Sequence, residues 1–126
     1  MNLPRPTDAE LAVLNVLWDR GPSTVRRIHE VISGDRDLGY TTVLKSLQVM
    51  TEKGLVLRDE TERSHVYAAA QTATQTQRSL LGDLMERAFG GSAAKLVIQA
   101  LHAKRASKQD LAEIRRLLDQ AEGGEG

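Results

Sequence analysis

The sequence predicts a mainly α-helical protein that carries one small β-hairpin. Most of the 126 residues fall into segments whose apolar side chains recur at helical spacing and which end at glycine or proline. One stretch, residues 55–68, changes to short runs of β-favouring residues around a polar tip. A further stretch of small and polar residues, AAQTATQT at positions 69–76, follows the hairpin and is expected to act as a hinge. These observations indicate two parts, one on either side of the hinge.

The first two helices have recognisable ends. Thr7 and Glu10 have the spacing of a capping box, and the Gly-Pro pair at 21–22 should end the helix that they begin. The Ser-Thr pair at 23–24 should cap the second helix, which is expected to end near the Ser-Gly pair at 33–34. The apolar residues expected to face the core from these helices are Leu11, Leu14, Leu17, Val25, Ile28 and Ile32.

The third helix is expected to start at Thr41 or at the neighbouring Tyr40 and to run to Lys53, and Gly54 should end it. A buried stripe at positions i, i+4 and i+7 is formed by Val43, Leu47 and Met50. Two strands should then form a hairpin, LVLRD at 55–59 and SHVYA at 64–68, with the polar residues ETER between them. Because an isolated two-stranded hairpin is only marginally stable, it should pack against the helices.

Three more amphipathic helices are expected in the second part. The first should cover residues 77–89 and end at the Gly-Gly pair at 90–91. Ser92 should cap the second of these helices, and Ser107 together with Asp110 should cap the third. The final residues, GGEG, should fray.

Three helices followed by a hairpin are the elements of a winged helix-turn-helix, in which the third helix enters the major groove of DNA and the hairpin flanks it. We therefore expect residues 1–72 to form a DNA-binding domain. On the third helix, threonine and serine hydroxyls and the ammonium of Lys45 lie off the buried stripe, where they can bond to base edges or phosphates. The candidate DNA-binding residues of the two helices and the wing are Thr24, Arg26, Tyr40, Thr41, Thr42, Lys45, Ser46, Arg63, Ser64 and His65.

The second part, residues 73–126, is expected to be a helical dimerisation domain. Aromatic residues make up only 3% of the sequence, so three short helices have little volume with which to bury their apolar stripes among themselves. A core shared with a second copy of the chain would bury them. The candidate interface residues are Leu80, Leu84, Phe89, Val97, Leu101, Leu111, Ile114 and Leu118.

The charge balance gives no general support to DNA binding. The chain holds 17 Lys and Arg against 17 Asp and Glu, whereas a basic surplus is the usual footprint of a nucleic-acid-binding protein. The first 70 residues hold nine basic and ten acidic side chains, a net charge of −1. The prediction therefore depends on where the basic groups lie. Two alternatives stay open: a winged helix that binds another protein, and a regulator of another family with a small-ligand pocket between the two parts.

An enzyme, a cofactor and a metal site are not expected. The chain has no cysteine, which excludes disulfides, Cys-ligated zinc and thiol chemistry. Its three histidines, His29, His65 and His102, fall in three different elements without metal-ligand spacing, and no nucleophile-elbow or P-loop motif occurs. No apolar run is long enough to span a bilayer, and the first residues lack the apolar core of a signal peptide. We therefore expect a cytoplasmic protein that is not inserted in a membrane.

Five stretches of the chain resemble one known family. They are TDAELAVLNVLW, GPSTVRRIHE, YTTVLKSLQVMTEKGLV, RSHVY and FGGSAAKLVIQAL. In this order, and over essentially the whole chain, they are similar to the penicillinase repressors of the BlaI, MecI and CopY type. The resemblance implies a dimeric transcriptional repressor whose winged helix binds half of a dyad operator in double-stranded DNA, and whose C-terminal helices entwine with a second chain.

The resemblance also implies a form of regulation. Penicillinase repressors are released by proteolysis that depends on a membrane-bound sensor protease, at an Asn-Phe pair in the second-last helix. Aligned from the Gly-Gly pair, that position is Gln99-Ala100 in this chain, so the scissile pair is not matched. CopY relatives sense metal through C-terminal cysteines, which this chain does not have.

Overall fold

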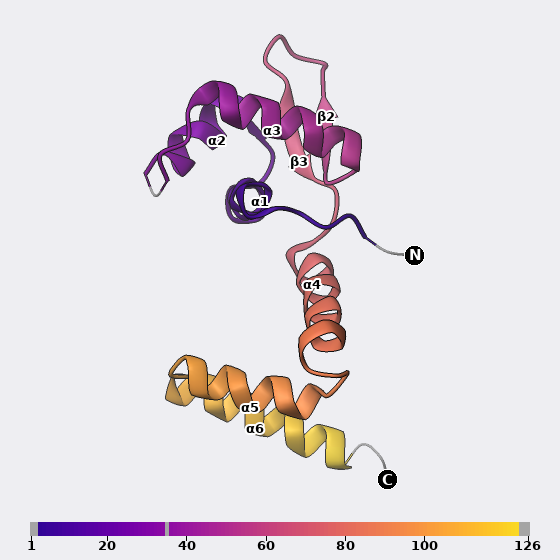
Figure 1. Ribbon diagram of the computed structural model, residues 1–126. Helices are drawn as coiled ribbons and strands as arrows, with labels where there is room; N and C mark the ends of the chain where they lie inside the picture. Colours follow the sequence, from indigo (N-terminus) through magenta and orange to yellow (C-terminus); the bar gives the residue numbers. More distant parts are fainter. Residues whose placement is uncertain (1–2, 35, 124–126) are drawn as a thin grey trace. The chain divides into compact units, whose positions relative to one another are not determined.

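The computed structural model describes residues 3–34 and 36–123, which form six helices and three short strands (Figure 1). The chain divides into two compact units, Met1–Gly82 and Asp83–Gly126. This division falls inside the fourth helix, whereas the boundary expected from the sequence, between residues 72 and 73, coincides with the start of that helix.

The first unit has the expected order of three helices and a hairpin, so the winged-helix prediction is confirmed. Its strands form one antiparallel sheet in the order β1-β3-β2. The sequence had indicated only the two strands of the hairpin. The elements are α1 (Asp8–Arg20), β1 (Ser23–Thr24), α2 (Val25–Ile32), α3 (Tyr40–Lys53), β2 (Val56–Asp59), β3 (Val66–Ala69) and the first part of α4 (Ala73–Ala88).

The helix ends follow the capping signals of the sequence. The Thr7 hydroxyl accepts a hydrogen bond from the backbone N–H of Glu10, and the Glu10 carboxylate accepts one from the N–H of Thr7, so the capping box is present. Thr24, rather than its neighbour, caps α2 by accepting from the N–H of Arg27. The helix α3 ends at Gly54, whose φ of 82° lies in the left-handed region that favours glycine.

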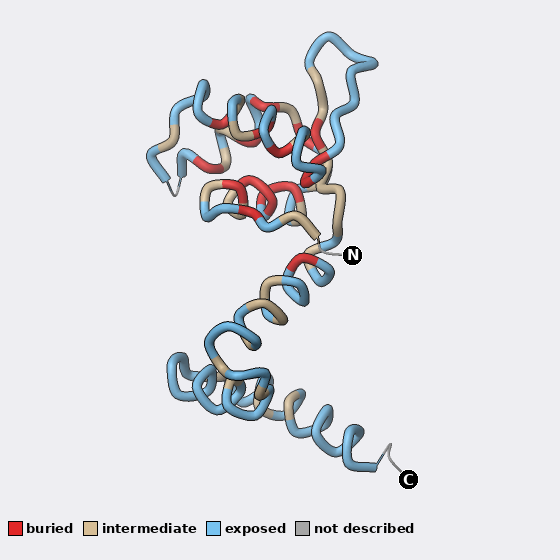
Figure 2. The backbone as a smooth tube through the Cα atoms, turned by 45° about the vertical axis from the view of Figure 1, so that its right-hand side comes forward, coloured by how far each residue is buried: buried red, intermediate tan, exposed pale blue. Residues whose placement is uncertain are grey.

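The core of the first unit lies between the three helices and the sheet. Figure 2 shows the buried residues gathered on α1, α2, α3 and the strands, with one further buried position, Thr76, at the start of α4. Tyr67 of β3 is 2% exposed and is the largest of the fully buried side chains. The buried apolar residues are Val13, Leu14, Val16, Leu17, Val25, Ile28, Ile32, Val43, Leu47, Met50, Leu55, Val56 and Tyr67.

The fourth helix begins earlier than the sequence had indicated, at Ala73 rather than Gln77. The hydroxyl of Thr72 accepts from the N–H of Gln75, and the Gln75 side chain accepts from the N–H of Thr72. This reciprocal cap starts a helix inside the stretch expected to be a hinge, so the hinge prediction is wrong for residues 73–76. Strand β3 is also displaced from its predicted position, because residues 64 and 65 belong to the loop of the wing.

The second unit holds the rest of α4, α5 (Ala93–Ala103) and α6 (Lys108–Gly123). Ser92 and Ser107 cap α5 and α6 as expected, since each hydroxyl accepts from the N–H three residues on. None of residues 83–123 is buried. The tail expected to fray begins with Gly123, the last residue of α6, and otherwise lies outside the described residues. Among the helices that the structure describes, none combines the length and hydrophobicity needed to cross a membrane.

Candidate nucleic-acid interface

The helix α3 has one buried and one exposed face. Val43, Leu47 and Met50 are at most 1% exposed and pack into the core. On the other side Thr41, Thr42 and Lys45 are exposed, while Ser46 and Leu44 are half-buried. The polar face therefore lies along the N-terminal half of the helix, as the sequence had indicated. We refer to Thr41, Thr42, Lys45 and Ser46 as the reading face.

A hollow of about 270 Å³ runs along the reading face. All four residues of the reading face line it, together with Val49 from the next turn of α3. Its other side is formed by Thr7 and Glu10, at the start of α1. Sequence reasoning had not placed these two residues at the site, because a capping box predicts only where a helix begins.

A second hollow, of about 310 Å³, lies where the N-terminal ends of α2 and α3 meet the wing. The pairing of β1 with β3 brings these parts together, since Thr24 stands opposite Val66. Tyr40 lies edge-on to His29 of α2, with their ring centroids 5.8 Å apart. The lining residues are Thr24, Val25, Arg26, Tyr40, Leu44, Arg63, Ser64, His65 and Tyr67. The two hollows thus contain every predicted DNA-binding residue.

Some charged side chains of the site have ion-pair partners within the part of the chain that the structure describes, and others do not. Arg26 lies 3.9 Å from Glu30, and His65 lies 3.9 Å from Glu60, which also forms an ion pair with Arg58 at 3.3 Å. Within residues 3–34 and 36–123, neither Lys45 nor Arg63 has an ion-pair partner. These two cations are therefore available to an anionic ligand.

The Asp59 carboxylate accepts hydrogen bonds from another residue of the wing. It accepts hydrogen bonds from the N–H and the hydroxyl of Thr61, at 3.0 and 2.7 Å. These bonds hold the pKa of Asp59 below its ordinary value. The carboxylate therefore stabilises the turn of the wing, which is consistent with a structural role for this acidic residue.

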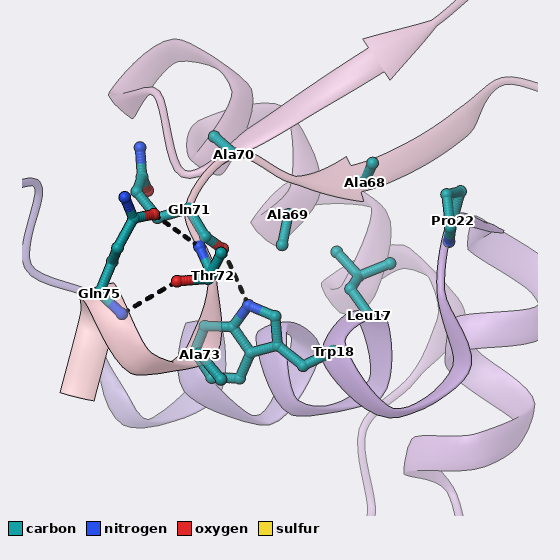
Figure 3. A pocket seen from close by; sticks show the side chains of 10 residues that line it. All are labelled: Leu17, Trp18, Pro22, Ala68, Ala69, Ala70, Gln71, Thr72, Ala73 and Gln75. Carbon is teal, nitrogen blue, oxygen red and sulfur yellow. Dashed lines mark hydrogen bonds between the residues drawn. The ribbon is translucent and has the colours of Figure 1, made fainter.

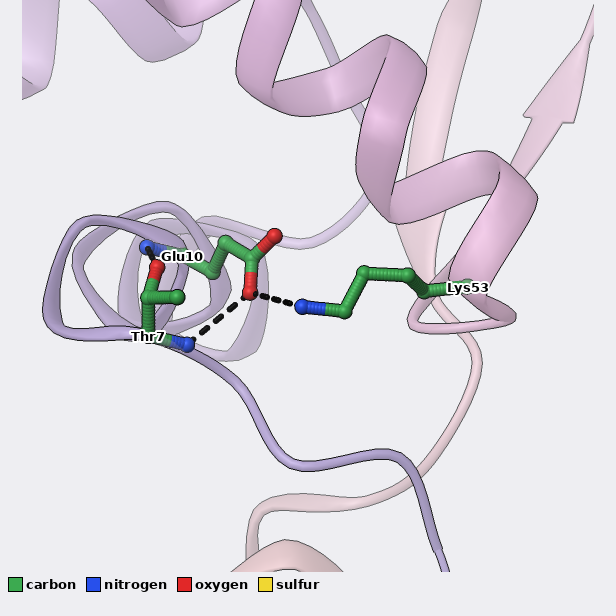
Figure 4. Close-up of polar contacts among 3 residues, drawn as sticks. All are labelled: Thr7, Glu10 and Lys53. Atoms are coloured by element: carbon green, nitrogen blue, oxygen red, sulfur yellow. Dashed lines mark hydrogen bonds and ion pairs between the residues drawn. The ribbon is translucent and has the colours of Figure 1, made fainter.

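Glu10 takes part in a partly buried ion pair at the edge of the reading face (Figure 4). One of its carboxylate oxygens accepts from the N–H of Thr7 at 2.9 Å and from the ammonium of Lys53, the last residue of α3, at 2.7 Å. Burial raises the pKa of Glu10, but the bonds from Lys53 and Thr7 outweigh it, and the pKa lies below its ordinary value. The carboxylate is therefore ionised at neutral pH.

A third hollow lies away from the predicted site residues, against Trp18 (Figure 3). It measures about 520 Å³ and is lined by apolar side chains and by the uncharged polar groups of Gln71, Thr72 and Gln75. The indole N–H of Trp18 donates to the carbonyl of Gln71 at 3.0 Å. The hollow lies within the first unit, and its lining includes Ala73 and Gln75, which follow the domain boundary predicted from the sequence.

The predicted interface residues of the second part lie on half-covered or open helix faces. Leu84, Val97, Leu101 and Leu118 are 42–56% exposed. Leu80, Phe89, Leu111 and Ile114 are half-buried. The pair at residues 99–100 lies within α5 and is exposed. Over the described part of the chain, no three His, Asp or Glu side chains gather closely enough to hold a metal ion.

Comparison with known proteins gives one family. A family model described as penicillinase repressor matches residues 6–120. The chain is also 36% identical, over 126 residues, to the protein called transcriptional regulator BlaI of Mycobacterium tuberculosis, in strains H37Rv and CDC 1551. The match covers 98% of this chain and 90% of that relative.

Proposed function

The chain belongs to the penicillinase repressor family, and on that premise we propose that it is a dimeric transcriptional repressor that binds a dyad operator in double-stranded DNA. The observation that carries the proposal is that ten polar residues predicted from the sequence line two hollows of the first unit, both of them bordered by α3. In the proposal, the reading face of α3 contacts base edges and the second hollow contacts the DNA backbone.

The reading face suits the major groove. Threonine and serine hydroxyls can donate to or accept from base edges, and a threonine methyl can pack on the methyl group of thymine. Lys45 is exposed and has no ion-pair partner among the described residues, so its ammonium can reach a guanine or a phosphate at no cost to the fold. A protein-binding winged helix would be favoured by an acidic or apolar face, which Thr41, Thr42 and Lys45 do not form.

The second hollow suits a backbone phosphate. Arg26 and Arg63 face it from α2 and from the wing, and His65 adds a ring nitrogen. The N-terminal end of α2 also borders the hollow, where unsatisfied N–H groups and the helix dipole favour negative charge. Phosphate contacts of this kind fix the position of a protein on the duplex without reading the sequence.

Dimerisation is supported by the apolar residues left open in the second unit. Large apolar side chains that remain half-exposed on several helices are typical of a surface covered by a partner. A twofold dimer would present two reading helices, one to each half of a dyad operator. Such a dimer would also cover α5. That helix has Gln99 and Ala100 in place of the scissile pair of the penicillinase repressors, so we do not extend the proposal to release by a sensor protease.

The test uses the full-length protein and an operator selected from random duplex DNA. We expect Thr42→Ala and Lys45→Ala to weaken operator binding while leaving the melting temperature unchanged, because both side chains are exposed. For Lys45, loss of a base contact should cost about 1–3 kcal/mol and relax the preference at one position, whereas loss of a phosphate contact should weaken all sequences alike. Lys108→Ala, at an exposed lysine of α6, is the matched control.

Two results would count against the proposal. The first is a wild-type protein that selects no sequence from the random pool. The second is a pair of variants, Thr42→Ala and Lys45→Ala, that melt normally and bind the selected operator as tightly as the Lys108→Ala control. In that case α3 does not lie in the groove, and the protein-binding alternative is favoured.

A further inference from the structure

A carboxylate at the edge of a DNA-reading surface has to be accounted for. Glu10 lines the same hollow as Thr42 and Lys45, and among the residues of the two hollows it is the one with a negative charge. Its side chain is 6% exposed. Since DNA presents a dense row of phosphates, an uncompensated anion here would repel the ligand at the point where the reading face approaches it.

The contacts of Glu10 place a cation directly on this anion. The ammonium of Lys53 lies 2.7 Å from a carboxylate oxygen of Glu10, although the two residues are 43 positions apart in the chain. Figure 4 shows the lysine side chain reaching from the end of α3 to the start of α1. The same oxygen accepts from the N–H of Thr7. The carboxylate is thus fixed in place and its charge is balanced.

Lys53 is poorly placed to read DNA itself. It is the last residue of α3 and lies two turns beyond Lys45, which is roughly 12 Å along the helix axis. Its side chain is 35% exposed, and its ammonium already bonds to Glu10. These features indicate a lysine that acts on the DNA-binding surface through the glutamate.

On the basis of the proposed function, we propose that Lys53 is a positioning residue of the DNA-binding surface, whose ammonium neutralises Glu10 so that the start of α1 and the reading face can approach the phosphates together. The pair then has an electrostatic role in binding in addition to its contribution to packing. It also explains how a buried acidic residue of a capping box is tolerated at this surface.

The test is a cycle of Lys53→Gln, Glu10→Gln and the double variant, each made in the full-length protein. Glutamine at position 10 keeps an oxygen that can accept from the N–H of Thr7 but removes the negative charge. Binding to the selected operator is measured at two salt concentrations, below the melting temperature of each variant. Circular dichroism at the same temperature verifies that each variant is folded.

We expect the two single variants to differ in direction. Lys53→Gln should weaken operator binding by about tenfold, and most strongly at the lower salt concentration, because an uncompensated anion is left near the phosphates and salt screens its repulsion. Glu10→Gln should bind at least as tightly as wild type, since it frees the positive charge of Lys53. The double variant should return close to wild-type affinity.

Each other result overturns the inference. If both single variants weaken binding equally, the pair serves only to hold α1 and α3 together. If Lys53→Gln and the double variant are equally weak, Lys53 contacts a phosphate itself. If Lys53→Gln binds like wild type, its charge has no role in binding. In all three cases wild type still binds operator, so the proposed function stands; a wild type that binds no operator would remove the proposed function itself.

Discussion

Replacing Leu101 by glutamate should separate the proposed dimer into monomers. Leu101 lies on α5 among the open apolar residues of the second unit and is 42% exposed. In a twofold dimer each substitution occurs twice, so a change at one position in the chain acts on two places in the interface. The same substitution should leave the first unit intact, because Leu101 belongs to the second.

The exposed fraction sets the size of the effect. Burying a whole leucine side chain is worth about 1.5–3 kcal/mol, so covering the 42% that is exposed is worth roughly 1 kcal/mol per chain and about 2 kcal/mol per dimer. A buried, unpaired carboxylate adds several kcal/mol more. A total of at least about 4 kcal/mol corresponds to a rise of about a thousandfold in the dimer dissociation constant.

Sedimentation equilibrium of wild type and variant at micromolar concentrations measures this constant. Leu57→Glu provides a matched control, because Leu57 is 63% exposed but lies on β2 of the first unit. The control should sediment as a dimer, and Leu101→Glu should sediment as a monomer with the circular dichroism of a helical protein. A wild type that is monomeric at these concentrations, or a Leu101→Glu variant that dimerises like wild type, would refute the reasoning.

Two further predictions concern the first unit. A fragment of residues 1–82 should melt at a higher temperature than a fragment of residues 1–72, because the shorter one lacks the buried Thr76 and most of the reciprocal cap of α4. Both should bind operator more weakly than the full chain, since one reading helix meets one half-site. Equal melting temperatures for the two fragments would contradict the first expectation, and a fragment that bound operator as tightly as the full chain would contradict the second. Because the folded-state pKa of Glu10 lies below its unfolded value of 4.5, its contribution to stability is complete above that pH and is lost as the pH falls through the folded value. Thermal melts should therefore show wild type losing more stability than Glu10→Gln on acidification below about pH 4.5, and equal losses would show that the carboxylate contributes nothing.

The sequence predicted those elements that have local signals. The capping box of α1 and the glycine after α3 are short patterns whose geometry is set by neighbouring residues. Strand β1 was missed because its two residues carry no alternation, and it exists only through its pairing with β3. The early start of α4 had a local signal, a threonine followed three positions later by glutamine. The small and polar composition of the surrounding residues had favoured a hinge instead.

Helix periodicity could predict which side of α3 is exposed. A buried stripe at Val43, Leu47 and Met50 implies which residues of α3 face away from the core. In the structure Thr41, Thr42 and Lys45 are exposed and Ser46 is half-buried. The approach of Glu10 and Lys53 could not be predicted in this way. It depends on how α1 packs against α3 across 43 residues of sequence, and no local pattern encodes that packing.

The chain as a whole has no net charge, and by itself this gives no support to DNA binding. The positions of the individual charges are nevertheless consistent with DNA binding. Arg26, Lys45 and Arg63 line the two hollows, and the negative charge among the lining residues, that of Glu10, is balanced by Lys53. A local basic surplus on a chain with no net charge favours contacts at short range, because the long-range attraction of a neutral molecule for phosphates is small. Non-specific binding should consequently be weak, with a small dependence on salt because few phosphates are neutralised, while the affinity for operator depends on a few placed cations. Substitution of Arg26, Lys45 or Arg63 should therefore change the affinity for operator more than substitution of a basic residue that lies outside the two hollows.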